Sequence, residues 1–328
     1  MRLEEALAGC SIERQRSGAT GGDINARVRG EQIALSGKIV DRRLPDFLAG
    51  RGIQCTQINR FGGKDAGGAI VNDPDRARLA VDKSVMHYEL VNAGIHTPYS
   101  VIVRNWEPGS FRLSDEEKKK LGNPFIIKPA CGYGRHGVVE HAHGSIREIA
   151  RARNFDHGDN FLLQERIDPV ELGGKRAWFR VFHVFDTIIP CWWDDRTSWY
   201  SHLAEEEFRD YRLSPLAKIV SRIADIAPLL WFSTEIAVDR RAGRLHFVAI
   251  DYVNDQCDMT AQSQDESGVP DSIVTFTAKC IVESAYHLLN NKQTDKDYTV
   301  WFRHGKRIRL KGLGDTPGPL TATPEEGG

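Results

Sequence analysis

The chain has 328 residues, with 44 Lys and Arg against 45 Asp and Glu, so its formal net charge is −1 at pH 7. This balance argues against a nucleic-acid-binding protein, because phosphate contacts normally require a basic excess. Hydrophobic residues make up 41% and charged residues 27%, as in ordinary globular proteins. No run of about 18 apolar residues is available for a membrane-spanning helix. The length predicts two or three fused subdomains.

The cysteines and the amino terminus predict a cytoplasmic protein. No two of the six cysteines lie within three residues of each other, so the chain has no C-x-x-C metal or redox pair. The first residues, MRLEEALAGC, carry acids where a secretion signal needs an apolar segment. Without such a signal, we expect free buried thiols rather than disulfides.

A first helix is predicted to begin at Asn72-Asp73-Pro74, where a capping side chain is followed by a proline in the first turn. Apolar residues then recur at helical spacing, and Gly94 is expected to end the helix. A strand is predicted over 99–103. The Ser114–Glu117 stretch has the pattern of a capping box and predicts a short helix that ends near Gly122.

The remaining elements alternate between strands and helices. Strands are predicted over 124–130, 138–142, 161–167 and 177–185, and helices over about 145–153, 214–230 and 270–290. A hairpin is predicted from the strands 234–239 and 244–251 around Arg241-Ala242-Gly243. Residues 313–328 are rich in Pro, Gly and Thr and predict a disordered tail.

A glycine loop, Gly132-x-Gly134-x-x-Gly137, separates the strands 124–130 and 138–142. A dinucleotide-binding loop must open a helix, whereas a strand follows this one. A strand–loop–strand unit instead predicts a hairpin flap whose N–H groups close over phosphates, as in protein kinases. Lys128 lies just before the loop, where its ammonium could reach the same phosphates. A flexible hairpin with a surface lysine is the alternative.

The later hairpin carries acids near its strand ends. Glu235 lies on its first strand, Asp251 ends its second, and Asn254 follows. Carboxylate and amide oxygens are ligands suited to Mg²⁺. The alternative is that Asp251 and Asn254 begin a loop and cap a turn.

In chain order, these motifs resemble the ATP-grasp superfamily, especially the carboxylate–amine ligases. The matching features are Asp82-Lys83 on a helix, the PFIIKPACGYGRHGVV stretch, LLQERI, Arg180 in FRVFHV, and the acidic hairpin. The resemblance covers about residues 70–290. It implies an α+β ATP-grasp fold, two α/β lobes clamping ATP, with a short N-terminal α/β subdomain. The expected ranges are 1–105 for the N-terminal subdomain, 106–167 for the small lobe, 168–312 for the large lobe and 313–328 for the tail.

The resemblance also implies a role for each matching residue. Two lysines would neutralise the phosphates, three glycines would form the flap, and the interlobe strand would contact the adenine. An arginine would hold the γ-phosphate, and the acidic hairpin would hold one or two Mg²⁺ ions. The two lysines are Lys83 and Lys128, and the flap glycines are Gly132, Gly134 and Gly137. The interlobe strand contains Gln164, Glu165 and Ile167. The arginine is Arg180, and the metal ligands of the acidic hairpin are Glu235, Asp251 and Asn254. The ribose partner stays open between Asp168 and Glu171.

Three features depart from the family pattern. The last metal motif is usually Glu-x-Asn followed by Pro-Gly, whereas this chain has Asp251-Tyr252-Val253-Asn254 without Pro-Gly. The extra residue changes strand parity, so Asp251 and Asn254 point the same way only if the strand bends or bulges. The N-terminal domain looks short, and 194–212 lacks the family's usual acceptor-side arginine and asparagine pattern.

The implied activity is ATP-dependent ligation of a carboxylate to an amine through an acyl phosphate, with amino acids or peptides as substrates. Two alternatives are a small-molecule kinase on the same fold and a non-catalytic ATP-binding protein. No nucleic acid or membrane partner is expected. Relatives often dimerise, so a homodimer is one expectation for the oligomeric state, which the sequence leaves open.

Overall fold

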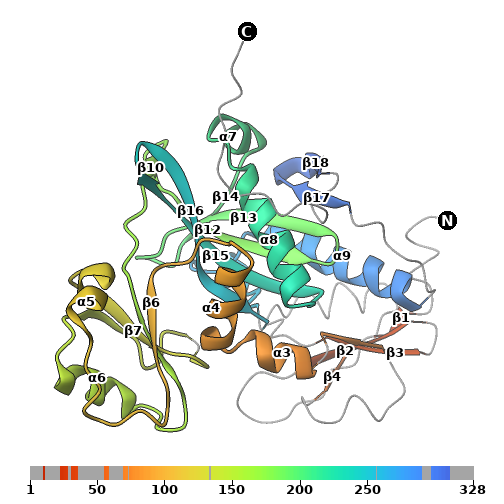
Figure 1. The fold of residues 1–328 in the computed structure, drawn as a ribbon. Helices are drawn as coiled ribbons and strands as arrows, with labels where there is room; N and C mark the ends of the chain where they lie inside the picture. Colours follow the sequence, from red (N-terminus) through yellow and green to blue (C-terminus); the bar gives the residue numbers. More distant parts are fainter. Residues whose placement is uncertain are drawn as a thin grey trace. The chain divides into compact units, whose positions relative to one another are not determined.

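The computed structural model describes residues 10–11, 23–28, 31–35, 55–58, 69–72, 74–132, 134–255, 257–289 and 297–310 (Figure 1). The predicted tail, 313–328, lies outside these residues. The chain divides into two compact units. Unit 1 holds the described residues up to Ala77, then Trp178–Thr234 and those from Asn254 on, and unit 2 holds Arg78–Ala177 and Glu235–Val253. Both units combine distant segments, and the four predicted ranges stay a prediction.

Unit 2 contains a four-stranded antiparallel sheet in the order β6-β9-β7-β8. The strands are β6 (Ser100–Val103), β7 (Phe125–Pro129), β8 (Val139–Ala142) and β9 (Phe161–Gln164). The helices α5 (Asp115–Leu121) and α6 (Ile146–Arg153) contribute Leu121, Ile149 and Ala152 to the core of this sheet (Figure 1). A small hairpin, β10 (Glu171–Leu172) with β11 (Lys175–Arg176), completes the strands that lie wholly in unit 2.

The first predicted helix is broken in two, which corrects the sequence expectation. The structure has α3 (Pro74–Ala80) and α4 (Lys83–Asn92). Between them, the Asp82 carboxylate accepts hydrogen bonds from the backbone N–H groups of Ser84 and Val85, so a new helix begins there. The predicted end is confirmed, since Gly94 follows α4 with a φ of 71°.

Local signals elsewhere in unit 2 are also confirmed. The Ser114 side chain accepts a hydrogen bond from the Glu117 N–H, and the Glu117 carboxylate accepts one from the Ser114 N–H. This is the capping box that the sequence predicts. Gly122 caps the C-terminus of α5 with a φ of 76°, a conformation that favours glycine.

The large sheet has the order β16-β15-β12-β13-β17-β18, with β14 paired to β13. Its strands are β12 (Trp178–Val184), β13 (Thr187–Trp193), β14 (Tyr200–His202), β15 (Trp231–Arg241), β16 (Arg244–Asn254), β17 (Tyr298–Trp301) and β18 (Arg307–Leu310). β15 and β16 have residues in both units. β12 and β13 pair antiparallel, and β13 and β17 pair parallel.

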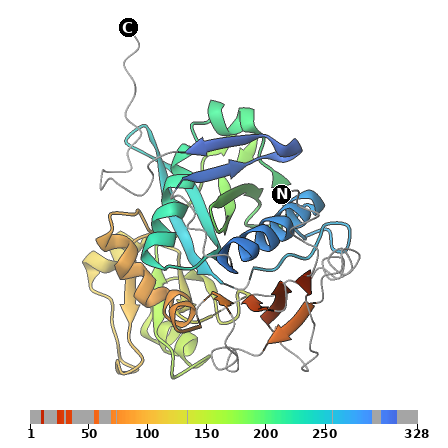
Figure 2. The same ribbon diagram turned by 90° about the vertical axis from the view of Figure 1, so that its right-hand side faces the viewer.

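Helices in unit 1 include α7 (Glu205–Asp210), α8 (Ser214–Ile226) and α9 (Asp271–Leu289), and the short 3₁₀ turn η2 (Arg303–Gly305) joins β17 to β18 (Figure 2). A further sheet joins β1 (Cys10–Ser11), β2 (Asp23–Val28), β3 (Glu31–Leu35) and β5 (Ala69–Val71), with β4 (Cys55–Ile58) paired to β2. The described sheets are mostly antiparallel, and helices pack against them. The predicted α+β class is therefore confirmed.

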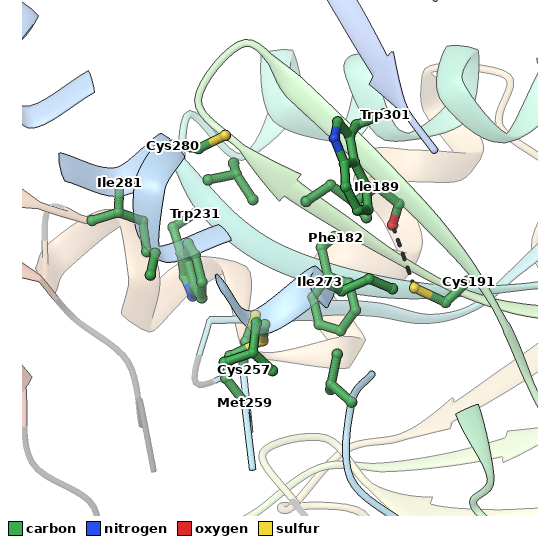
Figure 3. Close-up of a cluster of buried hydrophobic side chains, with 14 of the residues drawn as sticks. Phe182, Ile189, Cys191, Trp231, Cys257, Met259, Ile273, Cys280, Ile281 and Trp301 are labelled. Atoms are coloured by element: carbon green, nitrogen blue, oxygen red, sulfur yellow. Dashed lines mark hydrogen bonds between the residues drawn. The ribbon is translucent and has the colours of Figure 1, made fainter. Parts of the chain in front are cut away.

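A hydrophobic cluster between the large sheet and α9 forms the core of unit 1 (Figure 3). Phe182, Ile189 and Trp231 face Ile273 and Ile281 in this cluster. Cys191, Cys257 and Cys280 are also buried there and are free, as the sequence predicts, while Cys131 in unit 2 is free and exposed. Among the helices that the structure describes, none has both the length and the apolar character needed to cross a membrane.

Candidate active site

Lys83 connects three parts of unit 2. It is the first residue of α4, and its backbone N–H donates to the Ala130 carbonyl oxygen at 3.0 Å. Its ammonium donates to the Gly132 carbonyl oxygen at 2.7 Å and lies 3.6 Å from the Asp251 carboxylate. The predicted first ATP lysine is thus held at the start of the glycine loop and beside a predicted metal ligand.

Lys128 lies in β7 and is only 9% exposed. Its ammonium donates to the Ile250 carbonyl oxygen at 3.1 Å and lies 5.7 Å from the centre of the Tyr252 ring. Burial lowers the pKa of Lys128 to about 8, and the nearby Lys83 acts in the same direction. The carboxylates of Asp251 and Glu235 oppose this shift. A surface lysine, the alternative left open by the sequence, is therefore excluded.

Four of the predicted site residues come together in unit 2. Lys83, Lys128, Glu235 and Asp251 lie on α4, β7, β15 and β16, and the other three each act electrostatically on Lys128. Among the described residues, no three His, Cys, Asp or Glu side chains form a group that could hold a metal ion unaided. Two carboxylates beside two ammoniums instead suit a Mg²⁺ ion that is also bound by nucleotide phosphates, because Mg²⁺ in such sites takes few protein ligands.

The glycine loop has the predicted strand–loop–strand form, because β7 and β8 flank it and pair antiparallel. Gly137 has a φ of 73°, and a Cβ atom there would lie 2.6 Å from the Phe155 ring. Gly134 also has a positive φ, of 58°. At the base of the loop, the Cys131 N–H donates to the Asp159 carboxylate at 2.8 Å. The loop backbone therefore takes a shape that only glycine adopts without strain at Gly137.

The predicted adenine-contacting strand ends at Gln164. The Gln164 side chain is buried and donates to the Ser100 hydroxyl at 3.0 Å and to the Tyr252 hydroxyl at 3.2 Å. The Glu165 carboxylate accepts from the Tyr99 N–H at 3.1 Å and from the Arg241 guanidinium at 3.2 Å. Ile167 is 6% exposed. The side chains of Gln164 and Glu165 are thus engaged within the protein, and adenine contact by this segment stays a prediction.

The two candidate ribose partners lie close to the same arginine. Asp168 forms an ion pair with Arg176 at 3.3 Å and is well exposed. Glu171 stands opposite Arg176 in the β10–β11 register and is also exposed. The choice between them stays open.

Arg180 and Asn254 belong to unit 1. The Arg180 guanidinium donates to the Ser233 hydroxyl at 3.4 Å and lies 5.0 Å from the centre of the Trp193 ring. The carbonyl oxygen of Asn254, the last residue of β16, accepts from the Cys257 thiol at 3.4 Å. Between Asp251 and Asn254, both Tyr252 and Val253 are buried.

Three residues in unit 2 escaped the sequence analysis. The His87 Nδ1 lies 2.8 Å from the Tyr252 hydroxyl, and Arg241 joins Glu165 to Asp239. The sequence holds one signal for His87, since it follows Lys83 by four residues and so shares its helix face. Tyr252 and Arg241 lack such a local signal, because their partners are distant in sequence.

No family model matches the chain. The D-alanine–D-alanine ligase of Coprothermobacter proteolyticus is 26% identical over 189 residues, which cover 52% of this chain and 60% of that protein. The chain therefore spans about three fifths of that relative's length.

Among solved structures, the D-alanine–D-alanine ligase from Bacillus anthracis is similar at 15% identity, with 68% of this chain and 73% of that chain covered and a TM-score of 0.48. The RimK domain ATP-grasp protein from Sphaerobacter thermophilus is 16% identical, with 67% and 72% covered and a TM-score of 0.45. The predicted resemblance is confirmed: over about half of its length, this chain is similar in sequence to an ATP-grasp carboxylate–amine ligase.

Proposed function

We propose that this chain is an ATP-dependent ligase that joins a carboxylate to an amine through an acyl phosphate. The observation that carries the proposal is the convergence of Lys83 and Lys128 with Asp251, beside a glycine loop. Two ammoniums close together in a partly buried place repel each other, and a polyphosphate would relieve that repulsion. The likeness to a D-alanine–D-alanine ligase supports the same activity.

In the proposed reaction, a carboxylate oxygen of the substrate attacks the γ-phosphorus of ATP, and ADP leaves. The amine nitrogen then attacks the acyl carbon, phosphate leaves, and the nitrogen loses a proton. The protein provides no nucleophile. Lys83 and Lys128 would neutralise phosphate charge, and the planar guanidinium of Arg180 would hold the transferring phosphoryl oxygens. The glycine loop would exclude water, which would otherwise hydrolyse the acyl phosphate.

Magnesium fits the oxygen ligands of the acidic hairpin. Glu235, Asp251 and Asn254 would hold one or two ions, and a bound ion would add charge neutralisation at the phosphates. Glu235 is 8% exposed, and a buried carboxylate needs a nearby positive charge. The adjacent ammonium of Lys128 meets part of that need.

Amino acids or peptides are the proposed substrates, in keeping with the likeness to a D-alanine–D-alanine ligase. The identities of the carboxylate and the amine are left to experiment. A cytoplasmic location and a homodimer stay predictions.

A kinase is the second candidate, because the chain has Asp251 and Asn254 in place of the Glu-x-Asn of the ligases. A kinase would leave the phosphoryl group on its acceptor. A non-catalytic ATP-binding protein would bind nucleotide without turnover.

The test is ADP release from the full chain with ATP, Mg²⁺ and a pool of amino acids and small carboxylates, followed by mass spectrometry. A ligase yields ADP, free phosphate and a product lighter by one water than two pool members together. Lys128→Ala should abolish this product, and Lys119→Ala, at an exposed position, should not. A product heavier by one phosphoryl group would establish the kinase instead. Protein that gains about 3 kcal/mol of stability at a hundredfold excess of ATP over its Kd, yet releases no ADP, would be a binding protein.

A further inference from the structure

Tyr252 occupies the place where the acidic hairpin departs from the ligase pattern. It stands directly after Asp251, and its side chain is fully buried, with 0% exposed. Its contacts reach α4, β7 and β9, three other elements of unit 2 that carry predicted nucleotide-binding residues. No role was assigned to it by the sequence.

The hydroxyl of Tyr252 is fixed by two hydrogen bonds. The Gln164 amide donates to the Tyr252 oxygen at 3.2 Å, and His87 Nδ1 lies 2.8 Å from the same oxygen. Burial, followed by the nearby Lys128, lowers the pKa of His87 to about 4, which agrees with a neutral ring. These bonds to α4 and β9 fix the orientation of the phenol ring.

The face of this ring lies beneath the Lys128 ammonium, 5.7 Å from ring centre to Nζ. On another side, the ammonium donates to the Ile250 carbonyl oxygen at 3.1 Å. The charged groups around it are Lys83 on α4, Glu235 on β15 and Asp251 on β16. A ring face and a carbonyl dipole attract a cation without neutralising it. These two contacts therefore hold the ammonium without cancelling the charge that an anion would meet.

We propose that Tyr252 is a positioning residue, whose ring face holds the Lys128 ammonium in place for nucleotide phosphates and so sets the preference for ATP over AMP. The inference rests on the proposed binding of ATP. It explains why this chain places a large aromatic residue between Asp251 and Asn254. A lysine held in advance loses less side-chain entropy when the phosphates bind.

Calorimetric titration of the full chain with ATP and with AMP tests this role. Tyr252→Leu removes the ring face and should weaken ATP binding about tenfold, within the range of a desolvated cation–π contact, while AMP binding changes less than about twofold. Tyr252→Phe keeps the face and should keep the wild-type ratio of the two affinities. Phe125→Leu is the matched control, because it removes a ring from the core cluster of the same unit, on the face of β7 opposite to Lys128, and it should also keep the ratio.

Equal losses of ATP and AMP affinity in Tyr252→Leu, or no loss, would show that Tyr252 only fills the core and would overturn the proposal. If Tyr252→Leu fails to fold, a ring-fluorinated phenylalanine at this position replaces it. That ring has the shape of phenylalanine but a less negative face, so it should lose the ATP preference that Tyr252→Phe keeps; retention would overturn the proposal. Wild-type protein that binds neither nucleotide would refute the proposed function itself, and this inference with it.

Discussion

The Asp82 carboxylate accepts a hydrogen bond from the backbone N–H of Ser84 at 2.8 Å, and this contact makes Lys83 the first residue of a helix. The Ser84 hydroxyl donates to the same oxygen at 2.6 Å and accepts from the Asn160 side chain at 3.1 Å. The helix start is therefore tied to the segment before β9. The position of Lys83 depends on a residue with no part in phosphate binding.

Asp82→Ala should lower the free energy of unfolding by about 1 kcal/mol, the usual cost of losing an N-cap. It should also weaken ATP binding, because the frayed first turn no longer holds Lys83. Urea unfolding and nucleotide titration measure the two effects. Asp82→Asn keeps a capping oxygen and should retain most of both properties; if it behaves like Asp82→Ala, the carboxylate charge matters rather than the cap.

Lys128→Met should stabilise the nucleotide-free protein. The pKa of Lys128 is lowered to about 8 in the folded protein from 10.5, so folding is penalised wherever this lysine is protonated. The penalty is full below about pH 8 and fades as the pH rises toward 10.5. At neutral pH, its removal should raise the free energy of unfolding by about 3 kcal/mol. ATP should no longer stabilise the variant.

The matched control for this substitution is Lys119→Met, at an exposed position on α5. It should change neither the stability nor the response to ATP. A loss of stability in Lys128→Met would mean that the packing around this side chain outweighs the cost of burying its charge.

His87 should make the protein sensitive to acid. Its pKa is about 4 in the folded protein, against 6.5 unfolded, so the unfolded chain binds the extra proton as the pH falls through this window. Stability is full above about pH 6.5 and is lost toward pH 4. From pH 7 to pH 5, His87 should account for a loss of about 2 kcal/mol.

His183 has a pKa lowered by burial to about 3 and adds its own acid sensitivity, so variants must be compared with the wild type at each pH. His87→Gln should remove its share of the loss between pH 7 and pH 5. His141→Gln, at an exposed position, should leave the whole loss in place. Equal slopes for the wild type and His87→Gln would contradict the assignment.

The buried thiols should resist alkylation. Burial raises the pKa of Cys257 and of Cys280 to about 12, and it raises the pKa of Cys191 further. Iodoacetamide reacts with the thiolate, so none of the three should be modified in native protein at pH 8. Of the four cysteines whose side chains the structure describes, Cys131 should be labelled first in peptide mass spectrometry, since it is exposed, although burial of part of its side chain also raises its pKa to about 12. Early labelling of Cys257 would indicate opening of the core.

Features that depend on a few neighbouring residues could be predicted from the sequence. The Ser114–Glu117 capping box and the stop at Gly94 are of this kind, since each involves contacts within one or two helical turns. The helix break at Asp82 could not be predicted, because the apolar residues around it continue the helical spacing. Only the capping hydrogen bonds of Asp82 show that a new helix begins there.

Contacts between residues that are distant in sequence could be predicted only through the order of motifs that resembles a known family. The nearness of Lys83, Lys128 and Asp251 followed from the family resemblance, and the structure brings them together. Tyr252 and His87 are separated by 165 residues, and no local pattern links a strand tyrosine to a helical histidine. Arg241 is the last residue of β15, next to the hairpin turn, where a charged side chain is ordinarily solvated, so the sequence did not indicate its contact with Glu165.

Because unit 2 combines segments that are distant in sequence, it can complete its fold only late during synthesis on the ribosome. Lys128 donates its hydrogen bond to the Ile250 carbonyl oxygen and lies over the Tyr252 ring, and both partners are more than a hundred residues further along the chain. While the ribosome is still adding unit 1 residues 178–234, the nascent helix α4 and the sheet around β7 lack the strand that completes them. Because domains generally fold as units during synthesis, nucleotide binding should begin only after Val253 has left the ribosome.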